Sequence, residues 1–138
     1  EKYKDKVSWK EISGNKNIIW TTSMIEKFKN KVDWEELSCS DNEHLFTAEN
    51  LEKYKDYWNW RELSRNSDME LTPALLEQFV DYWDWSEIID SYGRDELYSM
   101  EFLEKYHDYI PASALQHSRL WDKLVEDEKK QLKIRIIS

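Results

Sequence analysis

The chain repeats itself about every 25 residues, and this periodicity constrains the fold more than any other feature of the sequence. One tryptophan position recurs at spacings of 25, 26 and 25 residues, at Trp9, Trp34, Trp60 and Trp85. Six residues earlier an aromatic residue recurs in step, at Tyr3, Phe28, Tyr54, Phe79 and, one copy further on, Tyr106. A repeat of this length is typical of chains in which small helical units stack on their neighbours.

We expect each copy to contain two short helices. The first follows a residue whose side-chain oxygen can accept from the free amides of a first turn; these residues are Thr21, Thr47, Thr72 and Ser99. An apolar residue before each cap, and another four positions into the helix, have the spacing of a hydrophobic staple. Pro73 supports this start, because its missing N–H costs nothing at the first helical position.

The second helix of each copy follows another set of cap-type residues, Ser8, Asp33, Asn59 and Asp84. A glutamate stands three positions after each of them, at Glu11, Glu36, Glu62 and Glu87. This is the spacing of a capping box, so we assign the glutamates to helix capping. A catalytic or metal-binding role is disfavoured, because carboxylates repeated once per copy lie in a line and do not converge on one small volume.

These patterns predict an all-α solenoid of about four helix-pair repeats with a C-terminal capping helix. The predicted copies lie near residues 1–20, 21–45, 46–70, 71–97 and 98–117, and residues 118–138 form the capping helix and tail. The fifth copy departs from the pattern, since Pro111 takes the cap position and Ala112 replaces the tryptophan. Beyond Ser118, one amphipathic helix is expected to bury Leu120, Trp121, Leu124, Val125 and Leu132.

The run YWNWRELSRN at residues 57–66, preceded by LEKYKD at 51–56, resembles Trp-rich tandem helical repeats of the W-x-W-x-x-L-S-x-N type. Such repeats occur in largely uncharacterised proteins of bacteria, phages and giant viruses. The resemblance covers roughly residues 1–110, with Val7 and Val32 in place of a tryptophan and Ile89 in place of the serine. It implies a helical repeat scaffold and no particular biochemical activity.

We assign most of the repeated aromatic side chains to the core between copies, because a short helix pair cannot bury its own apolar face. The predicted core comprises Trp9, Trp34, Trp60, Trp85, Trp58, Trp83, Tyr3, Phe28, Tyr54, Phe79 and Tyr106. Tyr57, Tyr82 and Tyr109 lie three residues beyond the main aromatic stripe. Aromatic rings at a surface can stack on a ligand, so these three tyrosines are the candidate partner-binding residues.

The composition excludes several classes of protein. Twenty Lys and Arg against 29 Asp and Glu give a net charge of −9, which disfavours nucleic-acid binding, while 14% aromatic residues disfavour disorder. No apolar run is long enough to cross a membrane, and Glu1 to Lys6 are too charged for a signal peptide. A single cysteine, Cys39, allows no internal disulfide. We therefore expect a folded cytoplasmic protein and favour a monomer.

Residues with catalytic or metal-binding potential form no known pattern. His44, His107 and His117 are scattered, and the sequence contains no Gly-rich phosphate loop, H-E-x-x-H or G-x-S-x-G motif. We therefore predict a scaffold that is not an enzyme, needs no cofactor or metal, and binds a macromolecular partner, most readily a protein. Two alternatives stay open. One is an acidic inhibitor or decoy, such as a nucleic-acid mimic or an anti-defence type protein; the other is a helical accessory region of a longer enzyme.

Overall fold

The computed structural model describes residues 8–137, and every regular element in this range is helical. The α-helices are α1 (Trp9–Gly14), α2 (Thr22–Phe28), α3 (Trp34–Ser38), α4 (Ala48–Lys53), α5 (Trp60–Arg65), α6 (Pro73–Gln78), α7 (Trp85–Ile88), α8 (Met100–Tyr106), α9 (Ala112–Leu115) and α10 (Arg119–Ile137). A short 3-10 helix, η2, spans Glu43–Leu45. The all-α prediction is confirmed for these residues. The predicted core residue Tyr3 lies outside them.

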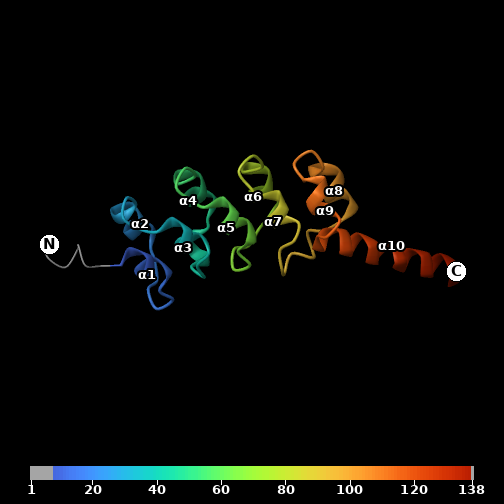
Figure 1. Ribbon diagram of the computed structural model, residues 1–138, viewed down its shortest axis with the longest axis horizontal. Helices are drawn as coiled ribbons and strands as arrows, with labels where there is room; N and C mark the ends of the chain where they lie inside the picture. Colours follow the sequence, from blue (N-terminus) through green and yellow to red (C-terminus); the bar gives the residue numbers. More distant parts are fainter. Residues whose placement is uncertain (1–7, 138) are drawn as a thin grey trace.

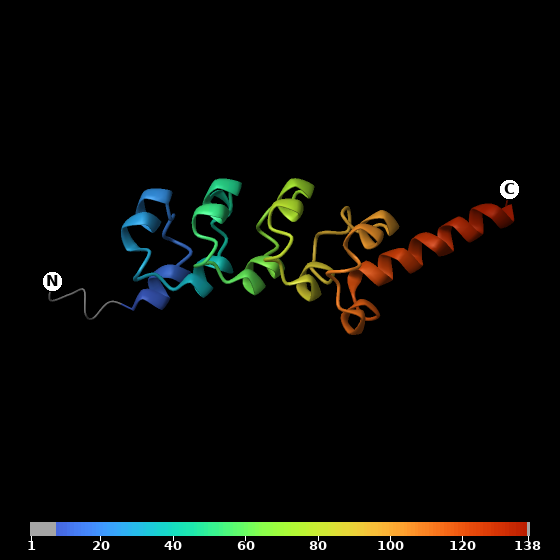
Figure 2. The same ribbon diagram turned by 90° about the horizontal axis from the view of Figure 1, so that it is seen from above.

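The helices are arranged in two parallel rows along the long axis of the molecule. Helices α2, α4, α6 and α8 follow one another in one row, and α1, α3, α5 and α7 form the other (Figures 1 and 2). Within the second row, α1 contacts α3, α3 contacts α5, and α5 contacts α7. Each helix pair therefore has the next pair of the sequence as its neighbour in space.

The helices of the first row begin at the predicted caps. The hydroxyl of Thr21 accepts from the amide of Met24, Thr47 from Asn50, Thr72 from Leu75, and Ser99 from Phe102. Pro73 is the first residue of α6, as predicted. These helices have only six or seven residues, a length at which an isolated helix is unstable in water. Their stability therefore comes from packing against neighbours.

The helices of the second row are joined to one another through serine side chains. The amide of Asp33 donates to Ser13 Oγ at 2.8 Å, that of Asn59 to Ser38 Oγ at 3.0 Å, and that of Asp84 to Ser64 Oγ at 2.8 Å. Ser13, Ser38 and Ser64 are buried and belong to the preceding helix of the row. We call these contacts the serine junctions.

The serine junctions correct the role assigned to three of the glutamates, Glu36, Glu62 and Glu87. The cap side chains do accept from the amides of Glu11, Glu36, Glu62 and Glu87, as predicted. In a capping box, however, the glutamate side chain returns a bond to the amide of the cap residue. At Asp33, Asn59 and Asp84 that amide is bound to a serine instead. The carboxylates of Glu62 and Glu87 pair with arginines, since Glu62 lies 3.9 Å from Arg65 and Glu87 lies 3.6 Å from Arg61.

The core runs between the two rows and is rich in aromatic side chains. Of the predicted core residues, the structure buries Trp58, Trp83, Trp85, Tyr54, Phe79 and Tyr106, and packs the half-buried Trp9, Phe28, Trp34 and Trp60 against them. The staple residues before the first-row helices are also buried: Trp20, Phe46, Leu71 and Tyr98. No helix between residues 8 and 137 is long and apolar enough to cross a membrane.

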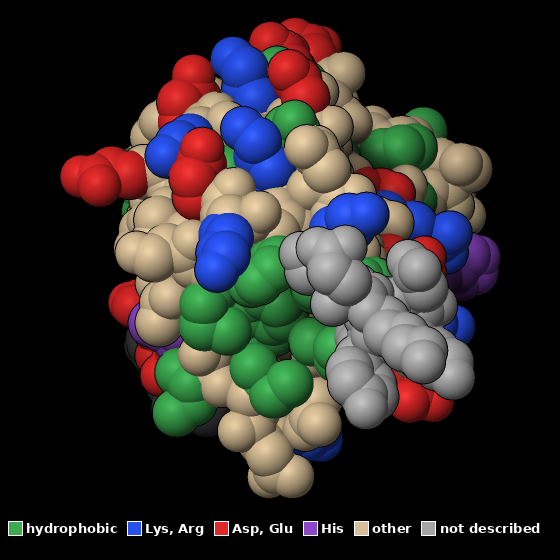
Figure 3. Space-filling model, turned by 90° about the vertical axis from the view of Figure 1, so that its left-hand side faces the viewer, with side chains coloured by type: hydrophobic (Ala, Val, Ile, Leu, Met, Phe, Trp, Pro, Cys, Tyr) green, Lys and Arg blue, Asp and Glu red, His purple; other side chains and the backbone are tan. Residues whose placement is uncertain are grey.

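The two ends of the rows differ. Hydrophobic side chains are gathered at the end formed by α1 and α2 (Figure 3), where Ile19 is 72% exposed. At the other end α10 docks by its first turn, and the amide of Leu120 donates to the carbonyl of Ile89 at 3.0 Å. Ile89 occupies the position of the junction serines, so this bond takes the place of a fourth serine junction.

Helix α10 buries less than the sequence predicts. Leu120 and Leu124 are buried, whereas Trp121, Val125 and Leu132 are 40%, 37% and 47% exposed. The reason is geometric, because the helix leaves the rows at an angle and its outer part projects beyond them (Figure 2). Its last residues are helical as well.

Candidate binding surface

The candidate residues Tyr57, Tyr82 and Tyr109 occupy the same turn in three successive copies. Each lies just after a first-row helix, and its amide donates to the carbonyl three residues earlier, at 2.9 Å in all three cases. Because the turn and the helix row both repeat, the three side chains follow one another along the molecule. We call them the tyrosine row. In the first copy the same turn carries Lys31, whose amide donates to the Phe28 carbonyl at 2.8 Å.

Each ring of the tyrosine row lies against a tryptophan from the copy before it. The ring centroids are 5.3 Å apart for Trp34 and Tyr57, 5.1 Å for Trp60 and Tyr82, and 5.7 Å for Trp85 and Tyr109. These are separations at which aromatic rings attract one another. The tyrosines nevertheless remain 40%, 38% and 42% exposed. Each one therefore presents one side to its tryptophan and another side to solvent.

Hydrogen bonds fix the tryptophans that support the row. The indole N–H of Trp34 donates to the carbonyl of Lys29 at 2.9 Å, that of Trp60 to Lys55 at 2.8 Å, and that of Trp85 to Val80 at 2.9 Å. A buried or half-buried indole N–H that finds an acceptor holds its ring in one orientation. The tyrosines consequently rest on a rigid base, and little side-chain entropy remains to be lost when a partner binds.

Charged side chains of both signs flank the row. Lys55 Nζ lies 5.9 Å from the ring centroid of Tyr82, within the range of a cation–π contact. One copy earlier, between α2 and α4, the Tyr54 hydroxyl donates to Glu26, and Lys53 Nζ lies 3.4 Å from the same carboxylate. The hydroxyl bond, with the lysine, lowers the pKa of Glu26. The carboxylate thus stays ionised at neutral pH. Because it lies beside a lysine, the surface next to the tyrosine row is neither uniformly basic nor uniformly acidic.

The same arrangement recurs between α6 and α8. Lys105 pairs with Glu77, and the Tyr106 hydroxyl donates to that carboxylate at 3.1 Å. The lysine bond is the main cause of the lowered pKa of Glu77, and the tyrosine bond adds to it. Between α4 and α6 the aromatic residue is Phe79, which has no hydroxyl, and Glu52 pairs at 3.3 Å with Lys55, just after the end of its own helix.

Behind the second row lies a buried polar network that the sequence did not reveal. Asn66 Nδ2 donates to the carbonyls of Ser38 at 2.8 Å and Ser40 at 2.9 Å, both one copy earlier. One copy further on, Arg94 donates to the carbonyls of Ser64 and Asn66, the latter at 2.9 Å. Arg94 is only 6% exposed, and its burial lowers the pKa of the guanidinium. An arginine still stays protonated at neutral pH.

Two shallow grooves lie beside these elements. One, of about 360 Å³, runs between residues 67–71 and 92–97 and is lined in part by Arg94 and Tyr92. The other, of about 500 Å³, lies between the beginnings of α4 and α6 and includes His44 and Glu70. Their volumes fall in the lower half of the range of ligand sites. The guanidinium of Arg94 is already occupied by backbone carbonyls and Ser91 Oγ, so it is a structural group.

The remaining reactive side chains are not brought together. Cys39 is exposed, and partial burial of its sulfur together with the charge of Glu36 raises the pKa of the thiol, which disfavours the reactive thiolate. His44 lies against the carbonyl of Trp20. Among residues 8–137 no three His, Cys, Asp or Glu side chains are grouped so as to hold a metal ion. Within the described residues, the tyrosine row is therefore the candidate surface whose geometry recurs from copy to copy.

Comparison with protein-family models, with curated proteins and with solved structures gave no match.

Proposed function

We propose that the chain is a solenoid of helix-pair repeats that acts as a scaffold without enzymatic activity and binds a partner protein along the tyrosine row. The observation that carries this proposal is the equivalence of Tyr57, Tyr82 and Tyr109. All three stand in the same turn, all rest on a fixed tryptophan, and all are exposed to nearly the same degree, 38–42%. A surface repeated in this way suits a partner segment that runs along successive copies.

The chemistry of the row favours protein over nucleic acid. Tyrosine rings offer a large apolar area with a hydroxyl at low entropic cost, and they are enriched where proteins meet. A nucleic-acid groove needs an uninterrupted basic surface to neutralise phosphates. Here Lys55, which lies over the Tyr82 ring, and Lys53, which lies over the Tyr54 ring, are each paired with a glutamate. The net charge of −9 acts in the same direction.

The test is affinity capture followed by binding measurements on the purified partner. The variant Tyr57→Ala/Tyr82→Ala/Tyr109→Ala should lose capture, and its affinity for the identified protein should fall by roughly 100-fold or more, since each interface aromatic contributes about 1–2 kcal/mol. Tyr92→Ala is the matched control, because Tyr92 is 73% exposed but lies outside the row. It should bind like the wild type.

Two outcomes would contradict the proposal. If the triple variant kept its affinity while its circular dichroism and melting temperature stayed unchanged, the row would not be the contact surface. If binding fell steeply with added salt and required acidic residues instead of the tyrosines, the acidic decoy would be the better description.

A further inference from the structure

The outer part of α10 is exposed to solvent. From Glu128 to Ile136 every residue is exposed, and the helix projects beyond the rows in both ribbon views (Figures 1 and 2). A helix this long, 19 residues or about 28 Å, is anchored by Leu120 and Leu124 near its beginning alone. A projecting helical segment of so few turns is marginal in water unless another surface covers it.

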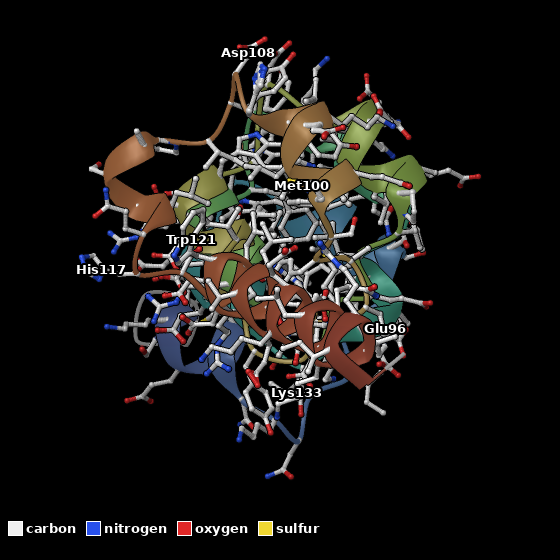
Figure 4. The ribbon with its side chains drawn as sticks, turned by 90° about the vertical axis from the view of Figure 1, so that its right-hand side faces the viewer. Glu96, Met100, Asp108, His117, Trp121 and Lys133 are labelled. Carbon is white, nitrogen blue, oxygen red and sulfur yellow. The ribbon has the colours of Figure 1, made fainter. Side chains whose placement is uncertain are left out.

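Four apolar side chains form a stripe along this helix. They are Trp121, Val125, Leu132 and Ile136, which are 40%, 37%, 47% and 82% exposed. Their spacings of four, seven and four residues place them on one side of an α-helix. We call them the outer stripe. Seen along the helix, Trp121 and Lys133 project from different sides of it, so the stripe and its charged flank are distinct (Figure 4).

The charges beside the outer stripe are divided between the two halves of the helix. On one flank the helical spacing places Asp122 and Glu126 first, and Lys129 and Lys133 after them. All four are exposed, and none forms an ion pair within residues 8–137. Away from this flank, two ion pairs form inside the helix, with Lys123 3.0 Å from Asp127 and Arg135 3.6 Å from Glu128.

We propose that a second copy of this chain covers the outer stripe, with the two α10 helices packed antiparallel. A two-fold axis near Glu128 and Lys129 sets Trp121 of one copy against Ile136 of the other. The same axis sets Val125 against Leu132, so every member of the stripe meets an apolar partner. Two copies related in this way use one surface twice, as the symmetry of a dimer requires.

The flanking charges specify the antiparallel direction. In an antiparallel helix pair, a flank of one helix faces the same flank of the other, and the residues of the two flanks run in opposite directions. Asp122 of one copy then lies beside Lys133 of the other, and Glu126 lies beside Lys129. The four charges that have no partner in one chain are thereby paired in two. Such charges beside an apolar seam set the partner and the orientation of helix pairs.

This pairing replaces the monomer favoured from the sequence, and it does not depend on the tyrosine row. It would bring two rows into one assembly, where a partner with two matching segments gains avidity without any new contact. Four apolar side chains from each copy form a small interface, at the weak end of specific contacts. Association should therefore vary with protein concentration.

Sedimentation velocity from ~1 µM to ~1 mM tests this, because weak contacts fall in this range. The wild-type mass should rise from one chain toward two. Val125→Glu/Leu132→Glu should stay monomeric throughout. Lys130→Gln/Gln131→Glu changes the net charge by the same amount away from the stripe and should dimerise like the wild type. Circular dichroism would show that both variants keep their helices.

A charge exchange tests the direction of packing. Lys129→Glu/Lys133→Glu makes the flank wholly acidic and Asp122→Lys/Glu126→Lys makes it wholly basic, so each alone should associate at least about tenfold more weakly. An equimolar mixture should regain dimers, detected by labelling one variant at Cys39, which is exposed. Wild-type chain that stays monomeric up to ~1 mM, or a mixture that fails to associate, would overturn the proposal.

Discussion

At two successive helix contacts of the second row, an equivalent pair of backbone carbonyls is hydrogen-bonded by different kinds of side chain. Between α3 and α5, the neutral amide of Asn66 donates to Ser38 and Ser40. Between α5 and α7, a serine, Ser91, stands at the asparagine position, and the charged Arg94 reaches the equivalent carbonyls from three residues further on. The comparison shows that the repeat preserves a requirement of the backbone, two buried carbonyls that need donors, and not a residue type.

The largest expected effect on stability comes from removing the charged donor, the guanidinium of Arg94. Arg94→Ala removes the charged donor from the carbonyls of Ser64 and Asn66, which keep only the Ser91 hydroxyl and the Met69 amide. The free energy of unfolding should therefore fall by about 3 kcal/mol. Urea denaturation followed by tryptophan fluorescence measures this. Arg94→Lys is the control, since an ammonium group keeps the charge but cannot donate to both carbonyls as the forked guanidinium does. Its free energy of unfolding should lie between those of the wild type and Arg94→Ala. An Arg94→Ala protein within about 1 kcal/mol of the wild type would show that the network is not stabilising.

A smaller loss is expected at the neutral junction. Asn66→Ala removes two neutral hydrogen bonds to carbonyls and the Asx contact from the Asp68 amide to Asn66 Oδ1. Neutral bonds are worth less than charged ones, so the loss should be about 2 kcal/mol. Placing an asparagine at the equivalent position, as Ser91→Asn in the Arg94→Ala background, should recover about half of what that variant lost. No recovery would mean that the two junctions are not interchangeable.

The two junctions should also differ in alkaline solution. Beside Arg94 the hydroxyl of Tyr98 donates to the Ile88 carbonyl at 2.6 Å, and burial raises the pKa of Tyr98 to about 12. The folded protein then holds this proton where the unfolded chain, with a tyrosine pKa near 10, releases it. Stability should therefore decline as the pH rises from about 10 through 12, by about 1 kcal/mol at pH ~11. Denaturation of Tyr98→Phe should show a shallower decline over the same pH range; an identical slope would assign it to other groups.

The smallest effect concerns the first row, where a tyrosine–glutamate hydrogen bond is present between some successive helices and absent between others. Tyr54 and Tyr106 each donate to a glutamate of the preceding first-row helix, but Phe79 has no hydroxyl to offer the equivalent Glu52. Phe79→Tyr should therefore stabilise the protein by about 0.5 kcal/mol, because the new bond is charge-assisted but, like those of Tyr54 and Tyr106, only partly buried. Thermal melting detects the gain. Adding Glu52→Gln should reduce the gain, and a loss of stability on Phe79→Tyr alone would mean that the hydroxyl is buried without a partner.

The sequence predicted those elements whose signals are local and repeated. The caps at Thr21, Thr47, Thr72 and Ser99 and the proline at the start of α6 follow from residue types that have few other uses at those positions. The exposure of the tyrosine row followed from its place beyond the aromatic stripe. The contact of the tyrosine row with tryptophans of the preceding copy could not be predicted, because it depends on the relative orientation of neighbouring copies.

The misassigned residues are those for which one spacing fits two structures. A glutamate three positions after a cap predicts a capping box, but a serine from the neighbouring copy reaches the cap amide first. Arg94 lies outside the repeated pattern, so nothing in the periodicity separates it from the solvated arginines. The amphipathic pattern of α10 predicted burial of five apolar side chains, but the described part of the chain buries only Leu120 and Leu124 among them.

The serine junctions have a consequence for how the protein is made. Each joins residues only 20 or 21 positions apart, and the serine that accepts always precedes the amide that donates. During synthesis the acceptor serine has therefore already left the ribosome when the next cap residue emerges. Contacts of such short range also favour rapid folding. The molecule can thus be completed from its first copy to its last while translation continues, without waiting for distant parts of the chain to meet.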